Sequence, residues 1–174
     1  MNGLRRGTRW PRPKTMPATS GAAGNAIKRR SPMFSQDVRD LLEQRHNAIV
    51  AIPRPSAGPH LSPVWFLWDG EAFYFRIAKS TAKYRNLKWN AAISLMVMDR
   101  EGYRYLTVSG QAQIMDSNPA DVAARIVEKY YAPHLAPQRM PQGPEPDVVT
   151  VRLRPEKVVE VHETIAQEAA DSWA

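Results

Sequence analysis

The stretch Lys79-Ser80-Thr81-Ala82-Lys83 has the clearest potential for binding chemistry in the chain. An apolar run ends just before it and a short helical pattern begins at Ser80 or Thr81, so a strand is predicted to give way to a helix here. Free backbone N–H groups, the positive end of the helix dipole, two hydroxyls and up to two ammonium groups meet at such a junction. The combination suits a phosphate site, but a capped helix with solvated lysines has the same composition and is, from this stretch alone, the more ordinary interpretation.

A second feature with chemical consequences is Pro63, which lies inside the otherwise apolar stretch from His60 to Trp68. Proline has no backbone N–H and therefore removes one donor from a strand ladder. The stretch is predicted to be an edge strand or a bulged segment, whose neighbouring backbone groups are free to bond something else. A flat heteroaromatic ring is one such partner.

Several kinds of site are excluded by what the chain lacks. It has no cysteine, which rules out disulfides, thiolate zinc sites, iron–sulfur clusters and a cysteine nucleophile. Its four histidines are widely separated and no acid pair has a telling spacing, so neither a metal site nor glycosidase-type chemistry is predicted. The glycine-rich fingerprints of dinucleotide-binding folds and P-loops, and the nucleophile elbow of hydrolases, are absent too. No catalytic side chain is assigned.

The elements that must position these residues follow from turn residues and periodicity. Ser35 caps a first helix that ends near Arg45, and Asp69-Gly70 is a strong hairpin signal. A short helix to Trp89 follows the phosphate-site candidate, and Asn118-Pro119 begins a helix to Tyr131. The predicted strands are 47–52, 60–68, 71–78, 91–98, 103–115, 148–153 and 158–162. About six to seven short, largely antiparallel strands with few helices predict a mainly β fold, a β-barrel with flanking helices.

Charge is distributed unevenly along the 174 residues. The net charge is +7, but residues 1–30 hold eight Lys or Arg and no acid, which leaves 16 basic and 17 acidic residues for 31–174, a charge of −1. Residues 1–32 are predicted to be a disordered basic tail, or an extension ahead of a true start at Met33. The domain is expected over 33–163, followed by a C-terminal tail at 164–174. Nucleic acid is an unlikely partner except weakly through the basic tail.

No run reaches the ~18 apolar residues of a membrane span, and no apolar stretch of signal-peptide length follows Arg5-Arg6. We therefore expect a cytoplasmic protein that has no contact with the membrane.

Four motifs stand in one consistent order: His-x-Ser-Pro-Val-Trp-Phe, Asp-Gly, Thr-Ala-Lys-x-Arg-Asn-Leu, and Tyr-Arg-Tyr with Val-x-Gly-x-Ala. They lie at 60–66, 69–70, 81–87, 103–105 and 108–112. This order resembles the split β-barrel flavin and deazaflavin proteins, often called pyridoxamine 5′-phosphate oxidase-like. The match is to the branch that uses coenzyme F420, and it covers about residues 34–163.

The resemblance implies an FMN-binding-like split β-barrel that forms a homodimer with two cofactors at the subunit interface. Ser62, Pro63 and Val64 would line the deazaflavin ring through backbone groups. The implied phosphate-binding residues are Ser80, Thr81 and Lys83, helped by Arg85 and Asn86, with Lys79 as a less close match. The implied activity is hydride transfer from the reduced deazaflavin to a conjugated organic substrate, without a dedicated catalytic residue.

Other functions stay open at this point. The same barrel could use FMN in an oxidase or reductase, because phosphate and ring contacts are shared in kind. It could also be a non-catalytic protein that binds a cofactor or a tetrapyrrole, since fold does not fix function. The substrate is not identified by the sequence.

Overall fold

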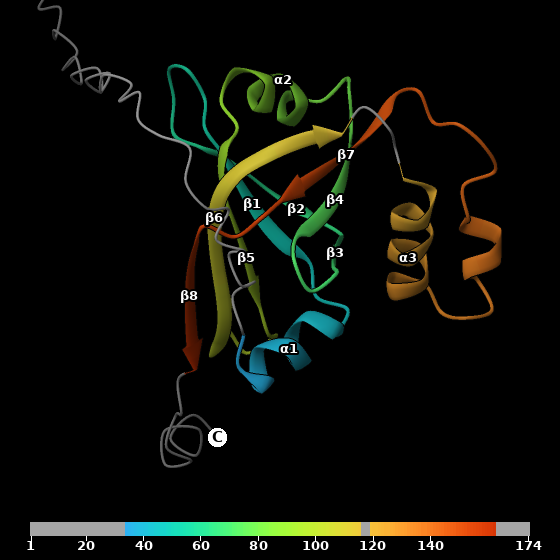
Figure 1. The fold of residues 1–174 in the computed structure, drawn as a ribbon, viewed down its shortest axis with the longest axis horizontal. Helices are drawn as coiled ribbons and strands as arrows, with labels where there is room; N and C mark the ends of the chain where they lie inside the picture. The colour runs from blue at the N-terminus through green and yellow to red at the C-terminus, as the bar shows by residue number, and fades with distance from the viewer. Residues whose placement is uncertain (1–33, 116–118, 163–174) are drawn as a thin grey trace, which may run out of the picture.

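The computed structural model describes residues 34–115 and 119–162, and in these ranges the chain forms a mainly β split barrel with flanking helices (Figure 1). The predicted basic tail 1–32, the C-terminal tail 164–174 and the helix-cap candidate Asn118 lie outside the described residues. The strands are β1 (Ala48–Ile52), β2 (His60–Val64), β3 (Phe66–Trp68), β4 (Phe73–Ala78), β5 (Ala92–Met98), β6 (Arg104–Met115), β7 (Val148–Leu153) and β8 (Lys157–His162). The helices are α1 (Gln36–Glu43), α2 (Ala82–Trp89), α3 (Ala120–Tyr130) and a 3-10 turn, η1 (Ala136–Arg139).

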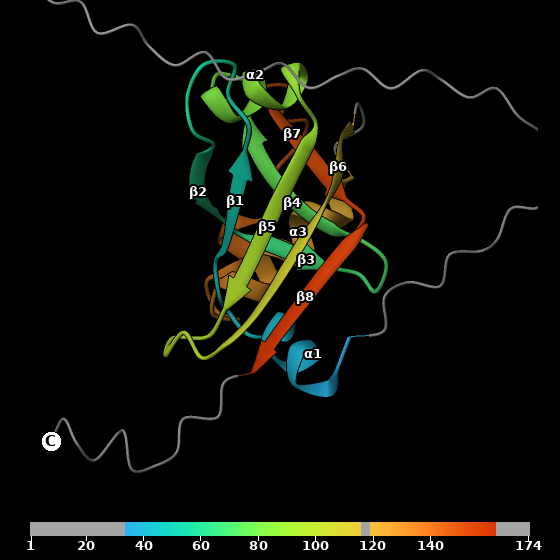
Figure 2. The same ribbon diagram turned by 90° about the vertical axis from the view of Figure 1, so that its left-hand side faces the viewer.

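All strand pairs in the described sheet are antiparallel, in the order β2-β1-β5-β6-β7-β4-β3, with β8 also paired to β6. The long strand β6 makes this branching possible, because its first half pairs with β8 and its second half with β7 (Figures 1 and 2). Gly110 lies at the branch, where an added Cβ would approach the Arg154 carbonyl oxygen to 2.5 Å. The predicted antiparallel barrel is confirmed.

The predicted strand His60–Trp68 is in fact two strands, and this is why the described residues contain eight strands and not six or seven. Trp65 separates β2 from β3, which lie at opposite ends of the strand order. At the break the Phe66 N–H donates to the Tyr130 hydroxyl at 3.2 Å. The interruption is therefore stabilised by a bond from α3, a contact across 64 residues that strand periodicity does not reveal.

The Asp69-Gly70 hairpin joins β3 to β4 as predicted. One carboxylate oxygen of Asp69 accepts from the N–H groups of Glu71 and Ala72 at 2.8 Å each, and Gly70 has a φ of +99°. Burial alone would raise the pKa of Asp69, but these hydrogen bonds outweigh it and the pKa is lowered. The turn thus combines a glycine in left-handed conformation with an ionised side-chain acceptor.

The helices cover the barrel along their apolar faces. Ser35 caps α1 by accepting from the Val38 N–H at 3.3 Å, as predicted, and the helix ends at Glu43, slightly before the predicted Arg45. Helix α3 begins at Ala120 and packs against β3 and β4. The main core contains Phe66, Phe73 and Phe75, all fully buried. None of the helices in the described part of the chain is long and apolar enough to cross a membrane.

Candidate functional site

The junction between β4 and α2 has the predicted form of a strand followed by a capped helix. Thr81 is the N-cap: its hydroxyl accepts from the Tyr84 N–H at 3.4 Å and donates to the Ala78 carbonyl at 2.7 Å. The cap orients the first turn of α2 so that Lys83 lines a cavity. The only hydroxyl proton of Thr81 is already donated to Ala78, so this side chain orients the helix and has no proton left to donate to a ligand.

The predicted phosphate-binding side chains differ in whether they already have a hydrogen-bond or ion-pair partner. The Arg85 guanidinium donates to the Ser80 carbonyl at 3.0 Å, which ties it to the loop. The side chains of Ser80, Lys83 and Asn86 make no hydrogen bond or ion pair with the residues that the structure describes. These three side chains, all predicted to bind a phosphate, therefore have no competing partner among the described residues.

A cavity of about 420 Å³ brings Pro63 and Val64 of the predicted ring segment together with Lys83 of the predicted phosphate segment. It is lined by Pro63, Val64, Trp65, Arg76, Lys83, Ala123, Ile126, Val127, Tyr131 and Arg139. Other predicted residues are not part of its lining: Ser62, Ser80, Thr81, Arg85 and Asn86. Pro63 and Val64 come from the end of β2, an edge strand of the described sheet, as predicted for a strand that contains proline. The Ser62 hydroxyl, which belongs to the same segment, is buried and has no hydrogen-bond partner in the described structure.

Aromatic side chains form one wall of this cavity. Trp65 stacks on Tyr130, with ring centroids 4.8 Å apart and an interplanar angle of 8°, and meets Tyr131 edge-on at 5.3 Å. The Arg139 guanidinium carbon lies 5.7 Å from the Tyr131 ring centroid. Sequence reasoning missed Trp65 as a lining residue, together with Tyr131 and Arg139, because α3 and η1 meet the β2–β3 break only in the tertiary structure.

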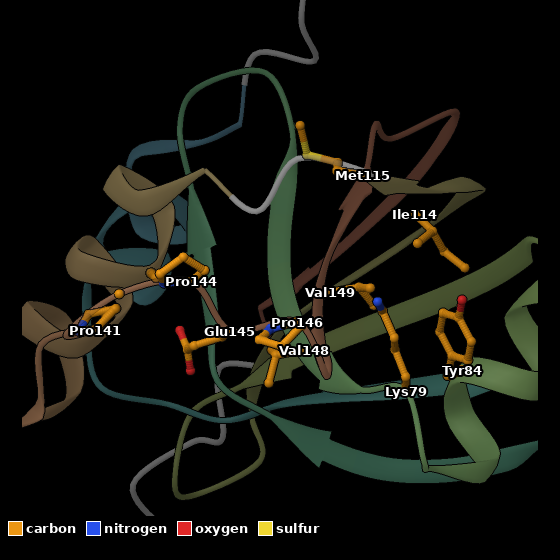
Figure 3. A pocket seen from close by; sticks show the side chains of 12 residues that line it. Lys79, Tyr84, Ile114, Met115, Pro141, Pro144, Glu145, Pro146, Val148 and Val149 are labelled. Carbon is orange, nitrogen blue, oxygen red and sulfur yellow. The ribbon is translucent and has the colours of Figure 1, made fainter.

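Figure 3 shows a second, larger cavity of about 590 Å³. An ion pair between Arg76 and Glu145 connects its lining to that of the smaller cavity. Arg76 lines the smaller cavity, whereas Glu145 lines the larger one. Lys79 also lines the larger cavity. The two lysines of the predicted phosphate stretch, Lys79 and Lys83, thus face different spaces.

The charges around the smaller cavity favour an anionic ligand. Arg76 is paired with Glu145, but Lys83 and Arg139 have no acidic partner among the described residues. The Nε of Arg76 is buried and unbonded within the same part of the chain. No group of three or more His, Cys, Asp or Glu in the described residues could hold a metal ion.

Comparison with known proteins places the chain in a family. The family model described as pyridoxamine 5′-phosphate oxidase matches residues 34–162, which is nearly the whole described barrel. The chain belongs to the pyridoxamine 5′-phosphate oxidase family. No match was found among curated proteins.

Solved structures of similar fold agree with membership of the pyridoxamine 5′-phosphate oxidase family. A structure described as an F420 reductase is 31% identical, with a TM-score of 0.55, and the match covers 70% of this chain and 94% of that one. A conserved hypothetical protein of Mycobacterium tuberculosis, Rv2991, is 20% identical, with coverages of 82% and 98% and a TM-score of 0.60. HutZ of Vibrio cholerae, a heme storage protein, is 19% identical, with coverages of 72% and 92% and a TM-score of 0.59. The last two matches bear on the fold alone.

Proposed function

We propose that this protein is an F420-dependent oxidoreductase that transfers a hydride between the deazaflavin and a conjugated organic substrate. One observation carries the proposal: a single cavity combines the Pro63-Val64 end of an edge strand with the unpaired Lys83 ammonium at the start of α2. A cofactor with a flat ring at one end and a phosphate on its side chain needs both features. The 31% identity to an F420 reductase favours the deazaflavin over other cofactors of the same barrel.

The residues of the smaller cavity fit such a cofactor in chemistry. The deazaflavin ring is flat and polar at its edge, which suits the end of edge strand β2 at Pro63 and Val64. The cofactor also carries a phosphate and a glutamate tail. Lys83 and Arg139 supply two cations that no described acid neutralises, so the cavity gains from an anionic occupant.

Each predicted residue then has a distinct task. Ser62, Pro63 and Val64 contact the ring, chiefly through backbone groups of the edge strand. Lys83 binds the phosphate together with Ser80 and the first free N–H groups of α2. Thr81, Arg85 and Asn86 complete this end of the site, with Thr81 acting mainly as the cap that orients the helix. Lys79, which lines the larger cavity, lies apart from this group.

When bound, the reduced cofactor supplies the hydride, so no side chain of the chain has to carry out the chemical step. The contribution of the chain is orientation and electrostatics. The stacked Trp65 and Tyr130 give the ring end a rigid apolar wall, which limits water beside the reacting face. The cations at the other end fix the cofactor by its anionic groups.

A second copy of the chain completes the site in this proposal. Leu61 and Trp65 flank the ring end and are 63% and 41% exposed, unusually open for large apolar side chains beside a binding site. A homodimer that covers this edge would bury both. It would also close the cofactor site from the side that a single chain leaves open.

A fluorescence titration of the full chain with F420, repeated with FMN as competitor, tests the proposed function. We expect micromolar or tighter binding of F420 that FMN does not displace. If FMN displaces F420, the protein is a flavin-dependent member of the family. If neither binds, the proposal is wrong and a non-catalytic role, such as tetrapyrrole binding, has to be tested.

A further inference from the structure

Most of the side chains that line the larger cavity are apolar, but polar atoms also form a substantial part of its surface (Figure 3). Ile114 and Met115 from the end of β6, Val148 and Val149 from the start of β7, and three prolines of the segment 141–146 make up most of its wall. Its volume of about 590 Å³ lies within the range of about 300–1,000 Å³ typical of small-molecule sites. The walls therefore fit a compact organic molecule that has both an apolar body and polar groups.

Two of the polar groups in this cavity are free. Neither the Lys79 ammonium nor the Tyr84 hydroxyl makes a hydrogen bond or ion pair within the described structure, and Figure 3 shows the two side chains next to each other on one side of the space. The acid in the lining, Glu145, is already paired with Arg76. Among the described residues that line the cavity, the remaining uncompensated charge is thus positive and comes from Lys79.

We propose that the larger cavity binds a small organic anion with a ring-sized apolar body, whose acidic group is held by Lys79 and Tyr84. Lys79 supplies the charge and Tyr84 a second donor, while Ile114, Val148 and the prolines contact the apolar body. The assignment takes Lys79 out of the cofactor phosphate site and gives it a ligand of its own.

The larger cavity adjoins the smaller one. Ala123 lines both cavities, and the Arg76–Glu145 pair joins the lining of one to that of the other. A molecule in the larger cavity is therefore separated from the cofactor site by one small side chain and one ion pair. Because a hydride passes only between atoms in contact, we assign this molecule as a neighbouring ligand of the cofactor site and not as the hydride acceptor; the binding of the anion does not rest on the proposed function.

The binding is tested on the full chain with two fluorescent probes that differ by one charged group, anilinonaphthalene sulfonate and the neutral N-phenylnaphthylamine. The unmodified chain should bind the sulfonate. Lys79→Met, which keeps the apolar stem, should weaken sulfonate binding about tenfold and leave the neutral probe unchanged, as expected for the loss of a charge-assisted contact. Lys157→Met, an exposed lysine on β8, is the matched control and should change neither affinity.

A second variant blocks the space itself. A Cβ at Gly143 meets nothing within 4 Å, so Gly143→Phe adds a ring to the cavity wall without a backbone clash. It should abolish binding of both probes while the thermal unfolding curve stays cooperative. If Lys79→Met leaves the sulfonate affinity unchanged, or if Gly143→Phe still binds both probes, or if the unmodified chain binds neither, the proposed site is wrong.

A titration of the same two proteins with F420 distinguishes failure of this proposal from failure of the cofactor assignment. F420 is titrated into the unmodified chain and into Gly143→Phe. Retained F420 affinity with lost probe binding supports two distinct cavities, whereas parallel loss of both overturns their separation. If the unmodified chain binds the sulfonate but not F420, the cofactor proposal fails and the anion site stands.

Discussion

The Tyr130 hydroxyl accepts a hydrogen bond from the Phe66 N–H at 3.2 Å and donates another to the His46 carbonyl at 2.7 Å. One side chain of α3 thereby bonds both the start of β3 and the segment that precedes β1. Burial raises the pKa of Tyr130 to about 12, so the hydroxyl remains a donor throughout the ordinary pH range. This bond stabilises the strand break at which the smaller cavity is built.

Tyr130→Phe should lower the free energy of unfolding by about 1–3 kcal/mol, because two partly buried backbone groups lose their partner while the ring stack is kept. Urea unfolding measures the change. Tyr103→Phe serves as the control, since Tyr103 is exposed and its hydroxyl has no partner among the described residues. Equal stability of the two variants would mean that the Tyr130 bonds contribute nothing to the fold.

Lys83→Ala should weaken F420 binding by about 1–3 kcal/mol, the range for losing a charge-assisted hydrogen bond to a phosphate. Equilibrium fluorescence titration measures the affinity. Lys88→Ala, an exposed lysine one turn further along α2 that lines neither cavity, tests whether general charge explains the effect. Unchanged affinity of Lys83→Ala would remove Lys83 from the cofactor site.

Lys129 should make the free energy of unfolding change with pH in the alkaline range. Burial lowers its pKa from 10.5 to about 8, against an opposing contribution from Glu43. Between these values the unfolded chain holds more protons than the folded chain, so the free energy of unfolding rises with pH. Below about pH 8 the lysine is charged in both states and the cost of burying it is constant.

The unfolding free energy of the unmodified chain minus that of Lys129→Met should therefore rise by about 2 kcal/mol from about pH 7 to about pH 9.5. Urea unfolding at the two pH values gives this difference, and the variant cancels other groups that titrate in the same window. A difference that stays constant would contradict a lowered pKa at this site.

Gly110→Ala should destabilise the barrel by about 1–3 kcal/mol, because the new Cβ would lie 2.5 Å from the Arg154 carbonyl oxygen and the backbone has to shift. Thermal unfolding of Gly110→Ala and Gly58→Ala gives a direct comparison. The Cβ at Gly58 meets nothing within 4 Å, so that variant should be close to neutral. Similar melting temperatures would contradict the tight approach at the β6 branch.

Cofactor affinity should depend on self-association, since the proposed site is completed by a second copy. Native mass spectrometry across a dilution series should show F420 mainly on dimers, and dilution to monomers should weaken binding. Tight F420 binding by a monomer would remove the subunit interface from the proposed site.

Local features were predictable from the sequence because they depend on neighbours in the chain. The Ser35 cap, the Asp69-Gly70 hairpin and the strand-to-helix junction at Thr81 are each specified by residues within four positions of one another. The motif order also predicted the family. For these elements, hydrogen bonding to nearby backbone is the deciding energy.

Only the tertiary structure decided where the cavities lie and which side chains share them. The strand break at Trp65 depends on Tyr130, 64 residues after the Phe66 N–H that it bonds, and the ion pair that links the two cavities joins Arg76 to Glu145 across 69 residues. The tertiary structure also places Lys79 and Lys83, which are four positions apart in the sequence, in the linings of different cavities. Such relationships arise when elements that are distant in the sequence pack together to bury apolar surface. The periodicity of one segment does not indicate which other segment it will pack against.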